Sequence, residues 1–321
     1  MADPQVSVVI PSYNHGRFVE AAVESVLAQD ADLELVVVDD GSTDDSVERL
    51  ARFAGDRRVR LFEQPNSGAH AALNRGLSLA RGEVLFILNS DDLFEPGRVR
   101  RFLERFEADP GVAVTSSWLR VVGEGGRELG VKEAWRNLPP WPRPEPGPGL
   151  ADTGDPVLAL LESNYVSTTS NVAFRRELFT ERRLRFRPLR YTHDWDFLLA
   201  AAGHGEIAIV DEPLVRYRVH QRSTIGEGRD RGMGRMRFEI LWVVARHARS
   251  ICRRFEARGM ESGNLRRRLW RSLPRFGCGN LLAQLLFLRG EGEEAPPAYD
   301  ALLDEEHPFR RRAISVVEST G

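Results

Sequence analysis

The chain has few cysteines, almost no lysine and no long apolar run, and each scarcity excludes a class of protein. Its 321 residues include two cysteines, Cys252 and Cys278. They are too few for a disulfide framework or a cysteine-rich zinc site. The apolar run at 281–288 is interrupted by Gln284 and is far shorter than the roughly 20 residues of a membrane span. The N-terminal residues lack the basic and apolar segments of a signal peptide. We therefore expect a cytoplasmic protein.

Lysine occurs once, as Lys132, so arginine carries nearly all the positive charge. The net charge of −2 argues against a nucleic-acid-binding protein that is basic overall. The charge is uneven, however, because residues 229–275 contain 14 arginines and only four acidic residues. A basic amphipathic helix of this kind can lie on the inner face of a membrane or mediate self-association. A helical subdomain packed on the main domain would explain the same pattern.

Short β-branched runs alternate with longer amphipathic runs in the first third of the chain, which is typical of βαβ units around a parallel sheet. The predicted strands lie at 6–10, 33–38, 59–62 and 84–88, and the predicted helices at 17–28, 44–54, 68–80 and 98–107. Later elements are a strand or strand pair at 112–122, helices at 157–161 and 195–202, and strands at 207–210 and 214–219. The sequence therefore predicts an α/β fold with a mainly parallel central sheet.

Two later segments differ in composition from this pattern. Residues 132–156 contain seven prolines and should form an irregular loop, either a lid, an acceptor platform or a simple insertion. Residues 226–234 are rich in glycine and arginine, which predicts a boundary between the main domain and a C-terminal region. We therefore expect a main domain at 1–225 and a helical, arginine-rich C-terminal region at 226–321.

Polar residues follow each of the first four predicted strands. Turn chemistry alone would explain any one of these segments. Ligands of open parallel sheets, however, bind beyond the carboxyl ends of the strands, so four such segments at one edge favour a binding site. The segments read PSYN at 11–14, DDGSTD at 39–44, QPNSG at 64–68 and NSDD at 89–92.

The motifs VSVVIPSYNHGRFVEAAVESVLAQ, ELVVVDDGSTDDS, QPNSGAHAALNRGL and LFILNSDDLFEPG resemble, in this order, those of the family 2 nucleotide-sugar glycosyltransferases. The resemblance is strong over roughly residues 5–110 and continues weakly to about 225 through YTHDWDFLLAAAGHG and YRVHQRST. It implies a GT-A type αβα sandwich in which 1–110 bind the nucleotide sugar and 111–225 provide the acceptor side and the catalytic base. It also implies metal-dependent, inverting sugar transfer.

The resemblance places a divalent cation at residues 89–92, where the family usually has Asp-x-Asp. Here Asn89 replaces the first acid, Asp91 occupies the second position and Asp92 follows. Bound Mn²⁺ or Mg²⁺ would offset the repulsion between adjacent carboxylates, and oxygen ligands suit both ions. Asp91 is the predicted metal ligand, together with His220 of YRVHQRS. A simple capping turn is the structural alternative.

The same resemblance assigns residues to the donor. One acid of the pair Asp39 and Asp40 would accept a hydrogen bond from the base, which favours a UDP-sugar. Asp40 is the preferred acid for binding the nucleoside, and Tyr13 would stack on the base. Arg216 and Arg218 could neutralise the leaving group. The predicted donor-binding residues are Pro11, Ser12, Tyr13, Asp39, Asp40, Asn66, Gly68, Asn89, Asp92 and Arg218.

The predicted catalytic base is Asp194, because HDWDF is similar to the family's Glu-Asp-x-x-Phe motif. His193 replaces the usual glutamate, and Phe197 matches the terminal aromatic residue. Asp194 could instead act as a helix N-cap, and Asp196 is the reserve candidate, expected to face another surface.

The resulting hypothesis is a glycosyltransferase of polysaccharide biosynthesis that acts on a hydroxyl of a glycan, lipid-linked or peptide acceptor. The glycine-rich loops of dinucleotide enzymes and P-loop proteins and the nucleophile elbow of hydrolases are absent. The alternative is a catalytically silent nucleotide-sugar-binding scaffold in a polysaccharide-assembly complex. Asn89 and His193 favour that alternative, since both depart from the acidic pattern.

Overall fold

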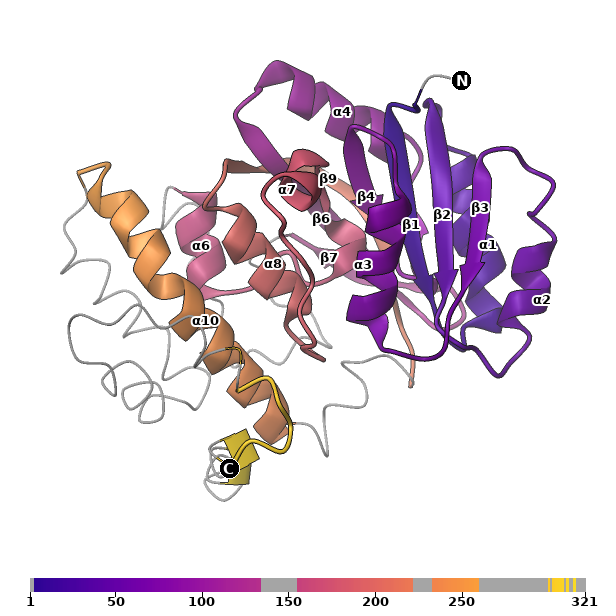
Figure 1. The fold of residues 1–321 in the computed structure, drawn as a ribbon. Helices are drawn as coiled ribbons and strands as arrows, with labels where there is room; N and C mark the ends of the chain where they lie inside the picture. The colour runs from indigo at the N-terminus through magenta and orange to yellow at the C-terminus, as the bar shows by residue number, and fades with distance from the viewer. Residues whose placement is uncertain are drawn as a thin grey trace.

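The structure is a computed structural model that describes residues 3–133, 155–221 and 233–259, and also 300, 302–308, 310–311 and 314–315 (Figure 1). Most of the predicted proline-rich loop and the later part of the predicted helical tail lie outside these residues.

One mixed sheet forms the centre of the described chain, with strand order β3-β2-β1-β4-β8-β6-β9-β5 and β7 beside β6. The strands β1 to β4 are mutually parallel, whereas β8 runs antiparallel to both β4 and β6. The strands are β1 (Val6–Ser12), β2 (Leu33–Asp39), β3 (Val59–Glu63), β4 (Val84–Ile87), β5 (Leu93–Phe94), β6 (Val112–Gly123), β7 (Glu128–Lys132), β8 (Ala173–Arg175) and β9 (Glu206–Val219). The sheet is thus parallel in the first half, as predicted, and mixed in the second.

The helices lie on both faces of this sheet (Figure 1). They are α1 (Gly16–Leu27), α2 (Ser46–Ala51), α3 (Ala69–Leu79), α4 (Arg98–Ala108), α6 (Pro156–Glu162), α7 (Glu177–Thr180), α8 (His193–Ala201) and α10 (Met233–Glu256), with a 3-10 turn, η1, at Thr169–Asn171. Local chemistry explains where α6 begins, because the side chain of Asp155 accepts hydrogen bonds from the backbone N–H groups of Val157 and Leu158, and Pro156 occupies the first turn.

Two hydrophobic cores lie on opposite faces of the sheet, because alternate residues of a strand point to opposite sides. Val8 and Ile10 of β1 pack with α1 and α4. Val9 packs on the other face, in the core that also contains residues of α3, α6, α8 and α10. The β-branched strands are buried on both faces, as expected for parallel sheets covered by helices.

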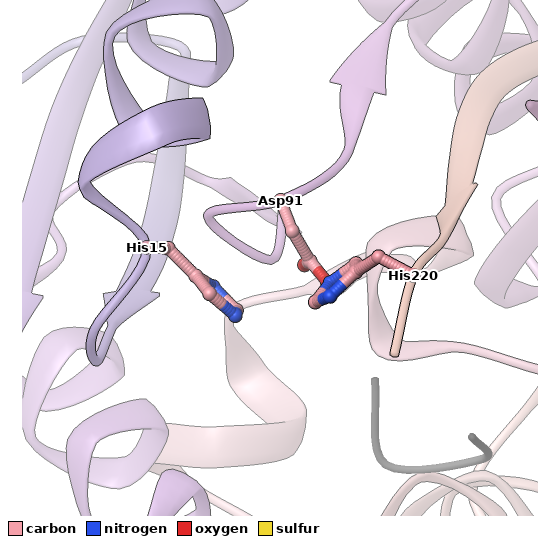
Figure 2. A group of neighbouring side chains, drawn as sticks. All are labelled: His15, Asp91 and His220. Atoms are coloured by element: carbon pink, nitrogen blue, oxygen red, sulfur yellow. The ribbon is translucent and has the colours of Figure 1, made fainter. Parts of the chain in front are cut away.

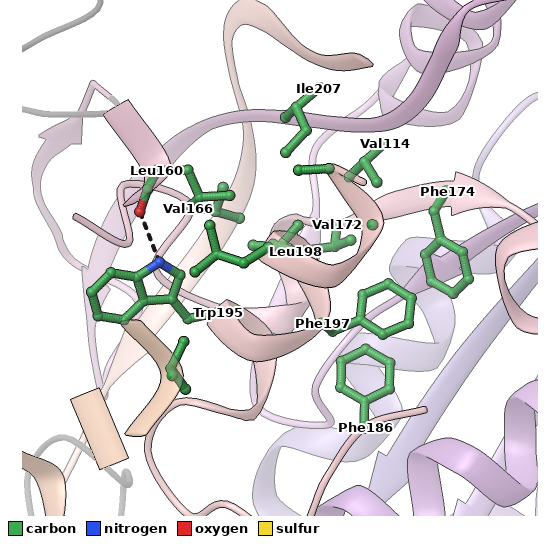
Figure 3. Packing of buried hydrophobic residues seen from close by; sticks show 14 of the residues in the cluster. Val114, Leu160, Val166, Val172, Phe174, Phe186, Trp195, Phe197, Leu198 and Ile207 are labelled. Atoms are coloured by element: carbon green, nitrogen blue, oxygen red, sulfur yellow. Dashed lines mark hydrogen bonds between the residues drawn. The ribbon is translucent and has the colours of Figure 1, made fainter. Parts of the chain in front are cut away.

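Aromatic packing fixes α8 against the second face. Phe197 stacks on Phe186 with ring centroids 4.3 Å apart and lies 4.8 Å from the ring of Phe174. The indole Nε1 of Trp195 donates a 2.8 Å hydrogen bond to the carbonyl of Leu160 in α6 (Figure 3). Side chains on α8 are therefore held rigidly relative to the sheet.

The described part of the C-terminal region packs on this same core. Phe238, Leu241 and Trp242 of α10 are fully buried, and α10 packs against α8 (Figure 1). Arg249 and Arg253 are exposed, and their contact with a membrane or a second copy stays a prediction. No helix in the described part of the chain has the length and apolar character needed to cross a bilayer.

Several elements differ from the sequence prediction. The two late strands form one strand, β9, which pairs with β6 through three register shifts. The predicted helix at 44–54 spans only Ser46–Ala51. Strands β5 and β8 have two and three residues, too few for a periodic pattern to predict.

Candidate functional site

The carboxyl ends of β1 and β2 are joined by side-chain hydrogen bonds. Ser12 pairs with Asp39 across the two strands, and its hydroxyl donates to Asp39 Oδ2 at 3.1 Å. The backbone N–H and the hydroxyl of Ser42 also donate to Asp39, at 2.8 and 2.7 Å. The buried carboxylate therefore fixes the turn that follows β2.

Asp40 fixes a second turn. It accepts hydrogen bonds from Gln64 Nε2 at 2.7 Å and from the backbone N–H groups of Ser67 and Gly68 at 2.9 and 2.8 Å. Gly68 has φ +89°, in the region that favours glycine. Both oxygens of Asp40 are thus used within the protein, whereas Asn66 on the same turn is exposed.

Tyr13 differs from its neighbours at this edge because 45% of it is exposed. The adjoining Ser12 is buried and Pro11 is half-buried. An exposed aromatic ring next to buried polar groups can stack on a planar ligand.

Three side chains from distant segments meet beside this edge (Figure 2). His15 precedes α1, Asp91 follows β4, and His220 follows β9. Their ligand atoms all lie within 4.8 Å of one another. His220 Nε2 is 3.0 Å from Asp91 Oδ2, and His15 Nδ1 is 2.8 Å from the hydroxyl of Ser90. This is the one such cluster among the described residues. His15 was not predicted from the sequence.

The pKa values of the two adjacent acids at this site are shifted in opposite directions. Burial would raise the pKa of Asp91, but the hydrogen bond from His220 and the charges of His15 and His220 lower it below its usual value. Burial, followed by the charge of Asp91, raises the pKa of Asp92 well above its usual value. Of the two acids, Asp91 is therefore the one whose ionised form is favoured.

Asn89 and Asp92 connect the turn after β4 to η1 and β9. The amide of Asn89 donates to Thr168 Oγ1 at 3.1 Å and accepts from Thr169 Oγ1 at 2.8 Å. Asp92 accepts from the hydroxyl of Ser170 at 2.6 Å and from the backbone N–H of Arg218 at 2.9 Å. Both side chains therefore have structural partners, and their contact with a donor stays a prediction.

The two candidate arginines have different surroundings. Arg216 forms a bidentate ion pair with Glu95, with distances of 2.9 and 3.0 Å. The guanidinium of Arg218 instead donates to the backbone carbonyls of Asp91 and Glu124, each at 3.0 Å. Arg218 therefore adds positive charge next to Asp91, whereas the charge of Arg216 is neutralised.

Asp194 lies in the first turn of α8, and Thr192 is the N-cap residue of that helix. The N-cap alternative for Asp194 is therefore wrong. Its carboxylate accepts from Asn164 Nδ2 at 3.0 Å and from the backbone N–H of Trp195 at 2.7 Å. The pKa of Tyr217 is raised well above its usual value, first by burial and then by the negative charges of Asp92, Asp91 and Asp194. Asp194 thus shares the surroundings of Tyr217 with the acids of the turn after β4.

Asp196 is buried and faces α10. It lies 2.7 Å from His247 Nε2 of α10 and 3.5 Å from Arg187 Nε. These contacts hold Asp196 against α10 and Arg187, so Asp194 stays the preferred candidate base.

Comparison with known proteins gives a match to the sequence model of "Glycosyl transferase family 2" over residues 7–182. An uncharacterized glycosyltransferase from Nostoc sp. (strain PCC 7120) is 32% identical over 67% of this chain and 65% of its own length. The succinoglycan biosynthesis protein ExoO of Rhizobium meliloti is 33% identical over 68% of this chain and 61% of its own. The chondroitin synthase of Escherichia coli is 37% identical over 41% of this chain and 20% of its own. The chain thus spans less than two thirds of each relative.

Solved structures share the fold at lower identity. Staphylococcus aureus TarS 1-349 in complex with UDP-GlcNAc superposes with a TM-score of 0.63 and 18% identity, over 98% of this chain and 91% of that one. The mannosyltransferase PcManGT from Pyrobaculum calidifontis in complex with GDP-Man and Mn²⁺ gives 0.54 and 18%, over 99% and 87%. The predicted GT-A type αβα fold is thereby confirmed.

Proposed function

Because the chain belongs to glycosyl transferase family 2, we propose that it transfers a sugar, with inversion, from a nucleoside-diphosphate donor to an acceptor hydroxyl. The observation that carries this proposal is the meeting of Asp91, His15 and His220 at the edge where β1 and β4 end. An ionised carboxylate and two imidazoles at one point form a ligand set for a divalent cation, as a metal-dependent transferase requires.

The metal-ligating atoms of the cluster suit such a cation and favour Mn²⁺ over Mg²⁺. Asp91 supplies a carboxylate, while His15 and His220 supply nitrogen atoms. Mg²⁺ prefers oxygen ligands, whereas imidazole suits transition metals better. When bound, the cation supplies positive charge to the diphosphate of the donor.

The nucleoside would lie over the ends of β1 and β2. The exposed ring of Tyr13 is free to stack on a base. Asp39 has a remaining acceptor site for a base N–H, since a carboxylate offers about four lone pairs. Asp40 holds the turn that contains Asn66 and Gly68 and would support the nucleotide indirectly. Uracil offers the required N–H, so a UDP-sugar is favoured.

Asp194 would act as the base. It accepts the proton of the acceptor hydroxyl while that oxygen forms a bond to the anomeric carbon, and the bond from this carbon to the diphosphate breaks. The hydrogen bonds from Asn164 and from the N–H of Trp195 fix the carboxylate in place. Arg218 adds positive charge near the leaving group.

The acceptor is proposed to be a glycan, free or lipid-linked, with a peptide as the alternative. The relatives include a chondroitin synthase and a succinoglycan biosynthesis protein, whose names connect them with polysaccharides. We place the chain in polysaccharide biosynthesis on the cytoplasmic side of the cell.

A UDP-release assay with a panel of UDP-sugars, a glycan acceptor and Mn²⁺ tests this function. The wild-type protein should release UDP in an acceptor-dependent way. Asp194→Asn should reduce release to a small residual rate and leave UDP binding nearly intact, because the substitution removes only the proton acceptor. Full activity of Asp194→Asn would show that the base is assigned wrongly. UDP binding by a wild-type protein that never transfers a sugar would favour the scaffold alternative.

A further inference from the structure

A buried carboxylate on α10 holds the backbone that leads into α8. Glu239 is fully buried. It accepts hydrogen bonds from the backbone N–H of Arg190 at 3.0 Å and from that of Tyr191 at 2.7 Å. The hydroxyl of Thr192 lies 3.5 Å from the same carboxylate, and Arg235 Nε donates to it at 3.2 Å. Four donors thus converge on one side chain.

These contacts end immediately before the residue proposed as the base. Thr192 is the N-cap residue of α8, and Asp194 lies in its first turn. Because Glu239 binds one backbone N–H with each oxygen, it fixes the direction of the chain as well as its position. An apolar side chain could pack against this backbone, but it would accept no hydrogen bonds and so would not fix the direction of the chain.

A second contact ties α10 to α8 on the other side of Asp194. His247 Nε2 lies 2.7 Å from Asp196 Oδ1, and Arg187 forms an ion pair with the same carboxylate. Asp194 itself faces Asn164 of the acceptor side. The backbone at 190–192 and the side chain of Asp196 are therefore both tied to α10, while Asp194 between them contacts Asn164.

A buried ion pair is a poor source of stability, because desolvation of the two ions opposes their attraction. What such a pair can provide is a specific geometry. For a catalytic base this matters greatly, since a misplacement of about 1 Å can cost on the order of 100-fold in rate.

We propose that Glu239 is a positioning residue for Asp194, so that α10 sets the geometry of the catalytic base. This inference rests on the proposed function. It assigns to the C-terminal region a part in transfer itself, and it requires no contact between Glu239 and either substrate.

The test compares Glu239→Gln with Glu34→Gln. Glu34 is a buried carboxylate that likewise accepts from a backbone N–H and arginine side chains, those of Arg60 and Arg81, but it lies at the opposite end of β2 from Asp39. Glu239→Gln should lower kcat by about tenfold or more. The Kd for UDP in Mn²⁺ should stay within about twofold. Glu34→Gln should leave both values within about twofold.

A double-variant cycle separates positioning from general loss of structure. In an Asp194→Asn background the geometry of the base no longer matters, so Glu239→Gln should change the residual rate by less than about twofold. An undiminished tenfold loss in that background would overturn the inference, and so would wild-type kcat in Glu239→Gln alone.

Amide hydrogen exchange gives a readout that does not depend on activity. Exchange at residues 190–197 should accelerate in Glu239→Gln more than in the rest of the chain, whereas Glu34→Gln should show no acceleration specific to these residues. If the wild-type protein transfers no sugar, the proposed function fails, whereas unchanged exchange in Glu239→Gln overturns the positioning inference itself. If Glu239→Gln does not fold, Thr192→Val replaces it, because this variant removes only the hydroxyl near the same carboxylate. Thr192→Val should accelerate exchange at 193–196. Wild-type exchange at these residues would contradict the inference.

Discussion

The imidazole of His220 lies 3.0 Å from a carboxylate oxygen of Asp91, although 129 positions separate the two residues in the sequence. His15 completes the cluster from a third segment. The fold thus assembles its candidate metal site from the ends of β1, β4 and β9, and each of the three side chains should contribute to metal affinity.

The first prediction concerns the two histidines. His15→Ala and His220→Ala should each weaken Mn²⁺ binding by at least about tenfold, because each removes one nitrogen ligand. Electron paramagnetic resonance of free Mn²⁺ measures this directly. His204→Ala is the matched control, since His204 is exposed after α8 and should have no effect. Wild-type affinity in both His15→Ala and His220→Ala would exclude the cluster as the site.

Asn164 is predicted to orient the base. Its Nδ2 donates to Asp194, while its Oδ1 accepts from the backbone N–H of Ser167 at 3.2 Å, which fixes the amide. Asn164→Ala should therefore lower kcat by about 10- to 100-fold with an unchanged Kd for UDP. Asn74→Ala removes a similar pair of hydrogen bonds, to the backbone of Phe186, and should lower thermal stability more than kcat. Equal kcat values for the two variants would contradict the role given to Asn164.

Tyr13 is predicted to bind the base of the nucleotide by stacking. Tyr13→Ala should weaken UDP binding by about 1–3 kcal/mol, whereas Tyr13→Phe should retain most of the affinity because the ring remains. Folding stability should be unchanged in both, since the side chain is exposed. Calorimetry and thermal denaturation measure the two effects. An equal loss of affinity in Tyr13→Phe and Tyr13→Ala would indicate that the hydroxyl, rather than the ring, binds.

Glu34 should contribute stability that depends on pH. Burial would raise its pKa, but hydrogen bonds from Arg81, Ser7 and Arg60 outweigh burial and lower the pKa below 4.5. A lowered pKa means that the contribution is complete above 4.5, the value in the unfolded chain, and is lost as pH falls through the folded-state pKa. Glu34→Gln should therefore cost about 1–3 kcal/mol at pH 7 and less in acid. Urea denaturation at pH 7 and pH 3 measures this, and an equal loss at both would contradict it.

Local patterns in the sequence were sufficient for the first half of the fold. Hydrophobic runs of five or six residues located β1, β2 and β4, and the polar residues after them located Asp39 and Asp91. Asp194 was proposed as the base from its motif, and that role stays a prediction. Single residues whose roles depend on distant partners were missed. His15 is one histidine in a loop until β4 and β9 place Asp91 and His220 beside it.

Glu239 shows the same limit. In the sequence it is one acid within a basic amphipathic helix, and only the packing of α10 on α8 brings it to the N–H groups of Arg190 and Tyr191. The short strands β5 and β8 were missed because two or three residues cannot show a period of two.

Calorimetric titration with UDP, dTDP and GDP in Mn²⁺, in Mg²⁺ and in EDTA tests the central claim most directly. The account predicts that UDP binds in Mn²⁺, binds more weakly in Mg²⁺ and is lost in EDTA. UDP binding of equal strength in EDTA, or no binding of any nucleotide in Mn²⁺, would contradict a metal-dependent donor site at Asp91.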